Sequence, residues 1–273
     1  MIFALIAACG FGLFDADPSQ GAVSPDNAAG AVATAEPPKA SFDPLPADVE
    51  LILEPAGFQA LVAPYDLGPS LAGHAQRVSY NTAVAVPQMA AVRTGAELGA
   101  LMVEASHQSP AVVTARLARI HDGLVAIKGD GPVLDPVTKL SAAVDAGLHG
   151  EAWVQVLQAH HALIQDSLVG HVGSDTVPLL LAGAWMQGAL LSIQAIRERG
   201  EYGAAPVLLR RPEIGRYFEA WVDHVGNDLF PEAALTGVKG SMADLRRLTD
   251  QDHISPQDAA AIQETLEGLL GMI

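Results

Sequence analysis

The sequence predicts an all-α fold, an antiparallel bundle of roughly five to eight helices. Two observations support this prediction. Ala and Leu dominate a composition with only 5% aromatic residues, so helix formers outweigh the residues that strands prefer. From residue 87 onward, apolar residues recur at helical spacing, whereas the sequence contains no alternating strand pattern bounded by turn residues.

The composition divides the chain into three parts. Residues 1–8 are an apolar run before the single cysteine, Cys9. Residues 9–45 are rich in Pro, Ser, Gly, Ala and Asp. This part cannot bury enough apolar surface to offset its chain entropy, so we expect a disordered tether. Residues 46–273 carry the helical signal and are predicted to form one domain.

The first predicted helices follow from start signals and apolar stripes. Two short apolar segments, 49–53 and 58–62, suggest single helical turns packed on the domain. A helix over 87–106 carries Gly95 and Gly99, which would let another helix approach closely. Ser109-Pro110 pairs an N-cap residue with Pro at the first helical position and begins a helix over 110–127. Its apolar stripe leaves Arg116 and Arg119 outside.

The remaining helices are predicted in the same way. Residues 128–132 end the previous helix and turn the chain, and helices follow over 136–146, 151–169, 177–199, 212–226, 241–249 and 256–270. The helix over 177–199 has no charge before Arg197, and its length is close to a bilayer span. Because it holds Gln187 and several small residues, we expect the buried centre of the bundle rather than a membrane span. The aromatic cluster at 217–221 is expected to pack the C-terminal helices together.

The charge balance excludes some classes of partner. The formal net charge is −16, and the sequence has no dense run of Lys or Arg. A nucleic-acid-binding protein needs a basic surface to displace counterions from phosphates, so no nucleic-acid partner is expected. The same charge disfavours binding to anionic lipid headgroups by electrostatics.

The N-terminal residues suggest where in the cell the protein resides. Ile6-Ala7-Ala8-Cys9 resembles the lipobox of bacterial lipoproteins, in which a short aliphatic and small-residue stretch precedes a cysteine. The resemblance implies that Cys9 carries diacylglycerol and a palmitate-type acyl chain. It also implies that the protein contacts the membrane through this lipid and that its domain faces the periplasm. Gly10, rather than Asp, follows the cysteine, which points to the outer membrane by resemblance to enterobacterial sorting rules.

The lipobox resemblance leaves alternatives open. A signal peptide has a basic beginning and spans about 15–30 residues. Here only eight residues precede Cys9, and the first basic residue is Lys39. Either the true start codon lies upstream, or the chain is truncated, or the motif is accidental.

A second resemblance covers roughly residues 86–196. The stretch 181–190, LAGAWMQGAL, resembles a Gly-x-Trp-x-x-Gly helix of uncharacterised helical lipoproteins from Bacteroidetes-type bacteria. Those proteins also carry a small-residue helix upstream, which residues 95–102 match. An acidic residue is usual there at the position of Gln187, so any site that depends on that acid is absent from this chain. The resemblance implies a fold and a compartment, and no activity.

Histidine is the only enriched reactive residue type, with nine copies. His160 and His171 are eleven residues apart, a spacing that returns to nearly the same helix face. With a carboxylate from another helix they are the candidate metal ligands. A metal- or haem-binding bundle is therefore the alternative function. The sequence has no His-x-x-x-His pair, the spacing by which one helix face offers two histidine ligands to a metal.

The sequence carries no catalytic signature. It has no Gly-x-Ser-x-Gly elbow and no phosphate-binding glycine loop followed by lysine, and its single cysteine excludes disulfides within the chain and covalent c-type haem. We therefore expect a non-enzymatic envelope lipoprotein, without a cofactor, whose helical domain binds or scaffolds a periplasmic partner.

Overall fold

The computed structural model describes residues 54–104, 107–172, 176–229 and 232–273. The chain divides into two units, Met1–Ala40 and Ser41–Ile273, and every described residue belongs to the second. No strand occurs among these residues, which confirms the predicted all-α class. Cys9, the predicted tether over 9–45 and the short segment at 49–53 all lie outside the described residues.

The described part of the chain contains eleven α-helices, of which eight have 15 or more residues. The eight longer helices agree with the predicted bundle. In chain order the helices are α1 (Pro55–Val62), α2 (Gly68–Ala75), α3 (Pro87–Glu104), α4 (Pro110–Ala126), α5 (Gly131–Asp145), α6 (Gly150–His171), α7 (Val177–Arg199), α8 (Ala205–Leu209), α9 (Pro212–Leu229), α10 (Glu232–Thr249) and α11 (Pro256–Leu270).

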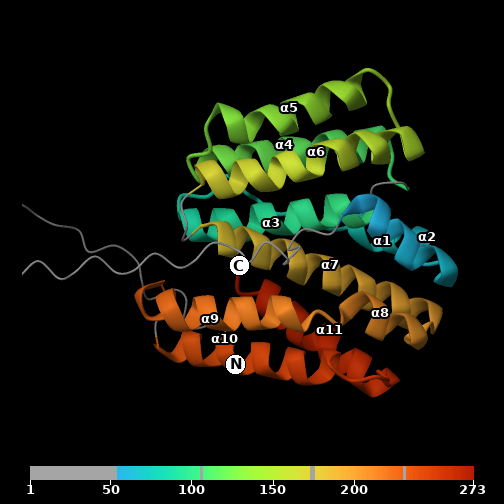
Figure 1. Ribbon diagram of the computed structural model, residues 1–273, viewed down its shortest axis with the longest axis vertical. Coiled ribbons are helices and arrows are strands. Elements are labelled where there is room, and N and C mark those ends of the chain that lie inside the picture. The colour runs from blue at the N-terminus through green and yellow to red at the C-terminus, as the bar shows by residue number, and fades with distance from the viewer. Residues whose placement is uncertain (1–53, 105–106, 173–175, 230–231) are drawn as a thin grey trace, which may run out of the picture. The chain divides into compact units, whose positions relative to one another are not determined.

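The helices of this unit lie in three layers (Figure 1). The middle layer holds α3 and α7, which make the most extensive helix contact in the described fold. On one side α4, α5 and α6 pack in chain order, and on the other α9, α10 and α11 pack together. Two apolar cores result, and α3 and α7 contribute side chains to both.

Glycines set the distance between α3 and α7. A Cβ added to Gly95 would lie 1.7 Å from the main-chain oxygen of Leu180, and one added to Gly183 would lie 2.0 Å from that of Val92. The same holds at Gly99, where a Cβ would lie 2.2 Å from a main-chain oxygen of α7. The two backbones therefore meet where side chains would not fit, which confirms the predicted close approach.

Helix α7 is the central helix that the sequence predicts. Among the described residues it alone has the length and the mean hydropathy, 1.5, of a candidate membrane span. Within the fold, 78% of this apolar window is buried by other helices. Its apolar surface is thus used as protein core, as expected for a helix that is apolar on all sides.

The Ser-Pro start signals give two helix beginnings correctly. Helix α4 begins at Pro110 and α11 begins at Pro256, as predicted. At α11 the N-cap Ser255 forms a capping box with Asp258: its Oγ accepts from the Asp258 N–H, and its own N–H donates to the carboxylate.

The prediction for α5 was wrong at its start. The helix begins at Gly131, with Asp130 as N-cap and Pro132 in its first turn, so Pro136 lies inside it. The sequence-based interpretation took 128–132 as a turn, but the chain has already turned at Lys128, which has a positive φ of 63°. Helix α10 also begins earlier than predicted, at Glu232.

Candidate functional site

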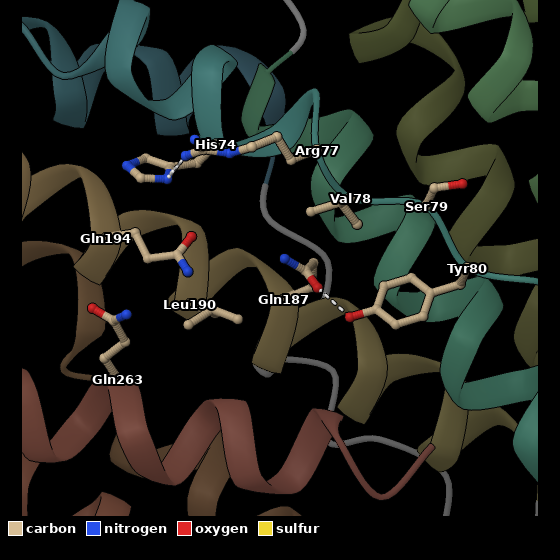
Figure 2. Close-up of a pocket in the computed structure, with 9 residues that line it drawn as sticks. All are labelled: His74, Arg77, Val78, Ser79, Tyr80, Gln187, Leu190, Gln194 and Gln263. Carbon is tan, nitrogen blue, oxygen red and sulfur yellow. Dashed lines mark hydrogen bonds between the residues drawn. The ribbon is translucent and has the colours of Figure 1, made fainter.

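An open pocket of about 520 Å³ is enclosed by three parts of the fold (Figure 2). They are the end of α2 with the segment that follows it, helix α7 and helix α11. Residues from both ends of the described sequence meet here. The nine lining residues are His74, Arg77, Val78, Ser79, Tyr80, Gln187, Leu190, Gln194 and Gln263. A concave site of this volume lies within the range of about 300–1,000 Å³ that small-molecule ligands occupy.

The segment 76–86, which links α2 to α3, forms one wall of the pocket and is fixed by side chains of the core helices. The N–H of Tyr80 donates to Oε1 of Glu97 over 2.7 Å, and Thr82 donates through Oγ1 to the main-chain oxygen of Arg119 over 2.6 Å. Arg93 donates to the main-chain oxygen of Asn81 over 2.9 Å. This irregular segment is therefore held by specific bonds at Tyr80, Asn81 and Thr82.

One of these bonds, from the Tyr80 N–H to Glu97, ends on a buried charge cluster. Glu97 on α3 and Arg116 on α4 are both 0% exposed, and Nη1 of Arg116 lies 2.5 Å from Oε2 of Glu97. Arg119 adds a bond of 2.8 Å to the other carboxylate oxygen. Arg116 also donates to the main-chain oxygen of Ala75, at the end of α2. The cluster thus joins α2, α3, α4 and the pocket wall.

Sequence reasoning missed this cluster. Arg116 was predicted to lie outside the apolar stripe of its helix, and this was wrong, because its side chain is fully buried. The spacing contains the signal: Arg116 is three residues after Val113 and four before Ile120, both in the stripe, so the three share a helix face. A buried arginine requires a buried carboxylate, and the charge of Glu97 meets that requirement.

Tyr80 and Gln187 form the inner end of the pocket. The Tyr80 hydroxyl donates to Oε1 of Gln187 over 2.9 Å, and Gln187 is only 1% exposed. Figure 2 shows the amide nitrogen of Gln187 on the side away from Tyr80, facing the space between the labelled residues. Burial raises the pKa of the Tyr80 hydroxyl, and the nearby negative charge of Glu97 raises it further. Tyr80 therefore stays a neutral donor.

His74 and Arg77 form the outer end. Arg77 donates to Nδ1 of His74 over 2.6 Å, and Nε2 of His74 lies 2.7 Å from the Glu198 carboxylate. Since a guanidinium can only donate, Nδ1 is the acceptor and Nε2 carries the proton. Nε2 lies within ion-pair distance of the Glu198 carboxylate, but not in hydrogen-bond geometry with it. Ser70 donates to Glu198, over 2.6 Å, and this bond is the main cause that lowers the pKa of that carboxyl, followed by the interaction with His74.

This arrangement differs from a nucleophilic triad. A nucleophilic serine must donate to the base, as in Ser–His–Asp. Ser70 instead donates to the carboxylate, and both ring nitrogens of His74 face other groups. The described pocket residues can therefore hold a ligand by hydrogen bonds and charge, but they provide no base aligned with a nucleophile.

The predicted metal ligands lie elsewhere, on α6. Nδ1 of His160 lies 2.8 Å from the main-chain oxygen of Val156, one turn earlier, and His171 is the last residue of the helix. Eleven residues of helix rise by about 16 Å, so His160 and His171 would have to serve separate ions. Among the described residues no group of three or more His, Cys, Asp or Glu side chains is placed to hold a metal. The metal role of these two histidines stays a prediction.

The aromatic cluster on α9 packs the fold. Tyr217, Phe218 and Trp221 are all less than 10% exposed and belong to the first core, and Phe218 also contacts Trp185 of α7. The sequence-based expectation was that this cluster packs the C-terminal helices together; its contact with Trp185 joins α9 to the central helix α7. Comparisons of the chain with protein-family models, with curated proteins and with solved structures find no match.

Proposed function

We propose that this chain is a non-enzymatic binding protein of the bacterial envelope, and that its helical domain holds a small ligand in the pocket between α2, α7 and α11. The observation that carries the proposal is the pocket itself. It combines a hydrogen-bonded polar pair, half-buried Tyr80 and buried Gln187, with a wall that is bonded to a buried charge cluster. Preformed polar groups in a concave site are typical of ligand recognition.

Binding is favoured over catalysis by what the polar groups contact. Enzymes that use acid–base or nucleophilic chemistry align a nucleophile with a base. Here His74 is held between Arg77 and Glu198, and Tyr80 donates to Gln187. These bonds orient donors toward a ligand, and no pair described in the pocket transfers a proton to or from a nucleophile.

The proposed cellular location rests on the sequence. The lipobox-like Ile6-Ala7-Ala8-Cys9 and the polar stretch that follows it support a protein anchored by lipid on Cys9. We propose that it resides in the outer membrane with its domain facing the periplasm. The net charge of −16 supports partners other than nucleic acid, such as a small solute or a periplasmic protein that delivers or receives it.

A thermal-shift screen tests the ligand-binding proposal. The full chain is heated with a panel of small acids, sugars, amines and peptides. A ligand at about 100 times its Kd stabilises the folded state by about 2.7 kcal/mol. For a domain of this size that raises Tm by about 5–10 °C. Ser79→Trp, on the exposed wall segment, should fill the pocket and abolish the shift.

The matched control is Thr138→Trp, an exposed residue of α5 that does not line the pocket. It should keep the ligand-induced shift. A panel that shifts no protein, or a shift that survives Ser79→Trp unchanged, contradicts the proposed function.

Mass spectrometry of the protein from its native membrane fraction tests the proposed cellular location. We expect a mature chain that starts at Cys9 and carries added acyl mass, and we expect Cys9→Ser to release the protein from the membrane. A free Cys9 thiol in the soluble fraction would remove the envelope from the proposal.

A further inference from the structure

The pocket lining has a charge opposite to that of the whole chain. The sequence has 31 acidic and 15 basic residues, yet the nine lining residues include no carboxylate and one permanent cation, Arg77. Two carboxylates stand just behind this lining and are already bonded. Glu198 accepts from Ser70, and Glu267 accepts from Gln263 over 2.6 Å. The permanent charge on the lining itself is therefore that of Arg77, which can pair with a negatively charged group of a ligand.

Two residues of the lining, Gln187 and Arg77, can offer hydrogen-bond donors to a ligand. Oε1 of Gln187 is already occupied by the Tyr80 hydroxyl, so the group that Gln187 offers the pocket is its N–H donor. Arg77 bonds to Nδ1 of His74, and its guanidinium has further N–H donors. A ligand that satisfies both residues must bring oxygen acceptors. Carboxylates are the acceptors that pair most strongly with guanidinium groups.

The ligand also has an apolar part. Val78 and Leu190 line the pocket, and Figure 2 shows Val78 between Arg77 and Gln187 and Leu190 beside Gln187 on α7. A ligand that spans the two polar ends would lay an aliphatic group against these side chains, which stabilises binding by removing apolar surface from water.

Resting on the proposed binding function, we propose that the ligand is a small organic acid of the N-acyl amino acid type. Its carboxylate pairs with Arg77, its aliphatic group packs on Val78 and Leu190, and its carbonyl oxygen accepts from the Gln187 amide. The ligand class follows from the juxtaposition of one cation, one buried donor and an apolar wall in a site without lining acids.

The test uses two probes of nearly equal shape, N-acetyl-L-leucine and its neutral carboxamide, N-acetyl-L-leucinamide. Isothermal titration calorimetry with the full chain should show the acid binding at least about tenfold more tightly, because a charge-assisted bond is lost in the amide. The affinity for the acid should also fall with added salt.

Three variants locate the binding. Arg77→Gln removes the cation. Gln187→Glu keeps an acceptor for Tyr80 but replaces the donor. Each variant should therefore lower the affinity for the acid by about tenfold or more. Arg210→Gln is the matched control, because Arg210 is an exposed arginine paired with Asp252, outside the pocket. It should leave the affinity unchanged. Circular dichroism confirms that each variant is folded.

The outcomes separate this inference from the function on which it rests. Equal binding of the acid and the amide at the pocket overturns the assignment of a carboxylate and leaves the binding function standing. The carboxylate assignment also fails, and the binding function stands, if neither probe binds but another compound of the screen binds to the wild type and not to Ser79→Trp. If neither probe binds and the screen is empty, both proposals fail.

Discussion

At the scale of single residues, burial changes the acid–base behaviour of Tyr217. Its side chain on α9 is 8% exposed, and its ring packs edge-on against Phe218 with 5.4 Å between the centroids. Burial raises the pKa of its hydroxyl from 10.0 to about 12. Removal from water disfavours the charged phenolate in the folded state.

This shift predicts a loss of stability in alkali. Between pH 10 and about 12, the tyrosine of the unfolded chain has lost its proton while that of the folded chain keeps it. The unfolded state then binds fewer protons, so the free energy of unfolding falls as the pH rises through this window. Tyr217→Phe lacks the group and should lose less stability between about pH 8 and about pH 11.

Urea denaturation of both proteins at the two pH values measures the difference. The other tyrosines and the lysines are common to both proteins and cancel in the comparison. Equal losses in the wild type and in Tyr217→Phe would show that this hydroxyl ionises in the folded state as it does in the unfolded chain.

At the scale of elements, the contact between α3 and α7 depends on the absence of side chains. Gly95 and Gly99 on α3 face α7, and Gly183 on α7 faces α3, so each backbone enters the groove of the other. Small residues allow this approach, and the many atom contacts that follow compensate for the entropy cost of glycine in a helix.

Gly95→Ala is therefore predicted to destabilise the fold, although alanine is the better helix former. The new Cβ would lie 1.7 Å from the main-chain oxygen of Leu180, and neither backbone can move without disturbing both cores. We expect a loss of about 1–3 kcal/mol or more in the free energy of unfolding, typical of overpacking.

Gly240→Ala is the matched control in α10, where an added Cβ meets nothing within 4 Å. Helix propensity alone should then stabilise the protein by up to about 1 kcal/mol. Thermal unfolding of both variants checks that Gly95→Ala lowers the stability and that Gly240→Ala raises it. A Gly95→Ala protein as stable as the wild type would contradict the close contact between α3 and α7.

At the scale of the whole described fold, the Glu97 cluster connects elements that are distant in sequence. It ties α3 to α4, to the end of α2 and to the wall that carries Tyr80 into the pocket. Glu97→Ala would leave Arg116, 0% exposed, without its carboxylate. We expect a loss of about 3–5 kcal/mol, because an uncompensated buried charge is costly.

The exposed pair of Arg210 and Asp252 provides the comparison. Asp252→Ala should change the free energy of unfolding by no more than about 1 kcal/mol. Combining Glu97→Leu with Arg116→Met should recover much of the loss, since no charge is then stranded. A small effect of Glu97→Ala, comparable with that of Asp252→Ala, would contradict the burial of the cluster.

The helix boundaries show which parts of the fold local sequence patterns predict. The predicted ranges 177–199 and 256–270 coincide with α7 and α11, because Pro near each start and a charged or glycine-marked end are local signals. Helices α2 and α8 were not predicted, and α5 and α10 begin earlier than predicted. Their first turns carry Gly-Pro or weak apolar periodicity, and tertiary packing decides their conformation.

The pocket was largely beyond prediction. Of its lining residues only Gln187 was singled out, and then for the acid that it replaces. The bond between Tyr80 and Gln187 joins residues 107 positions apart, and that between Arg197 and Gln263 joins residues 66 apart. Nothing in the local pattern of a helix specifies which distant residue will face it.

The sequence by itself determined the all-α class, the positions of most long helices, the burial of α7 and the close approach of another helix to Gly95 and Gly99, because helix propensity, periodicity and residue size act over a few turns. Only the tertiary structure decided that Arg116 is buried against Glu97, that segment 76–86 forms a wall, and that side chains from α2, α7 and α11 meet in one pocket. These features arise from how helices pack against one another, which depends on contacts between residues that are far apart in the chain.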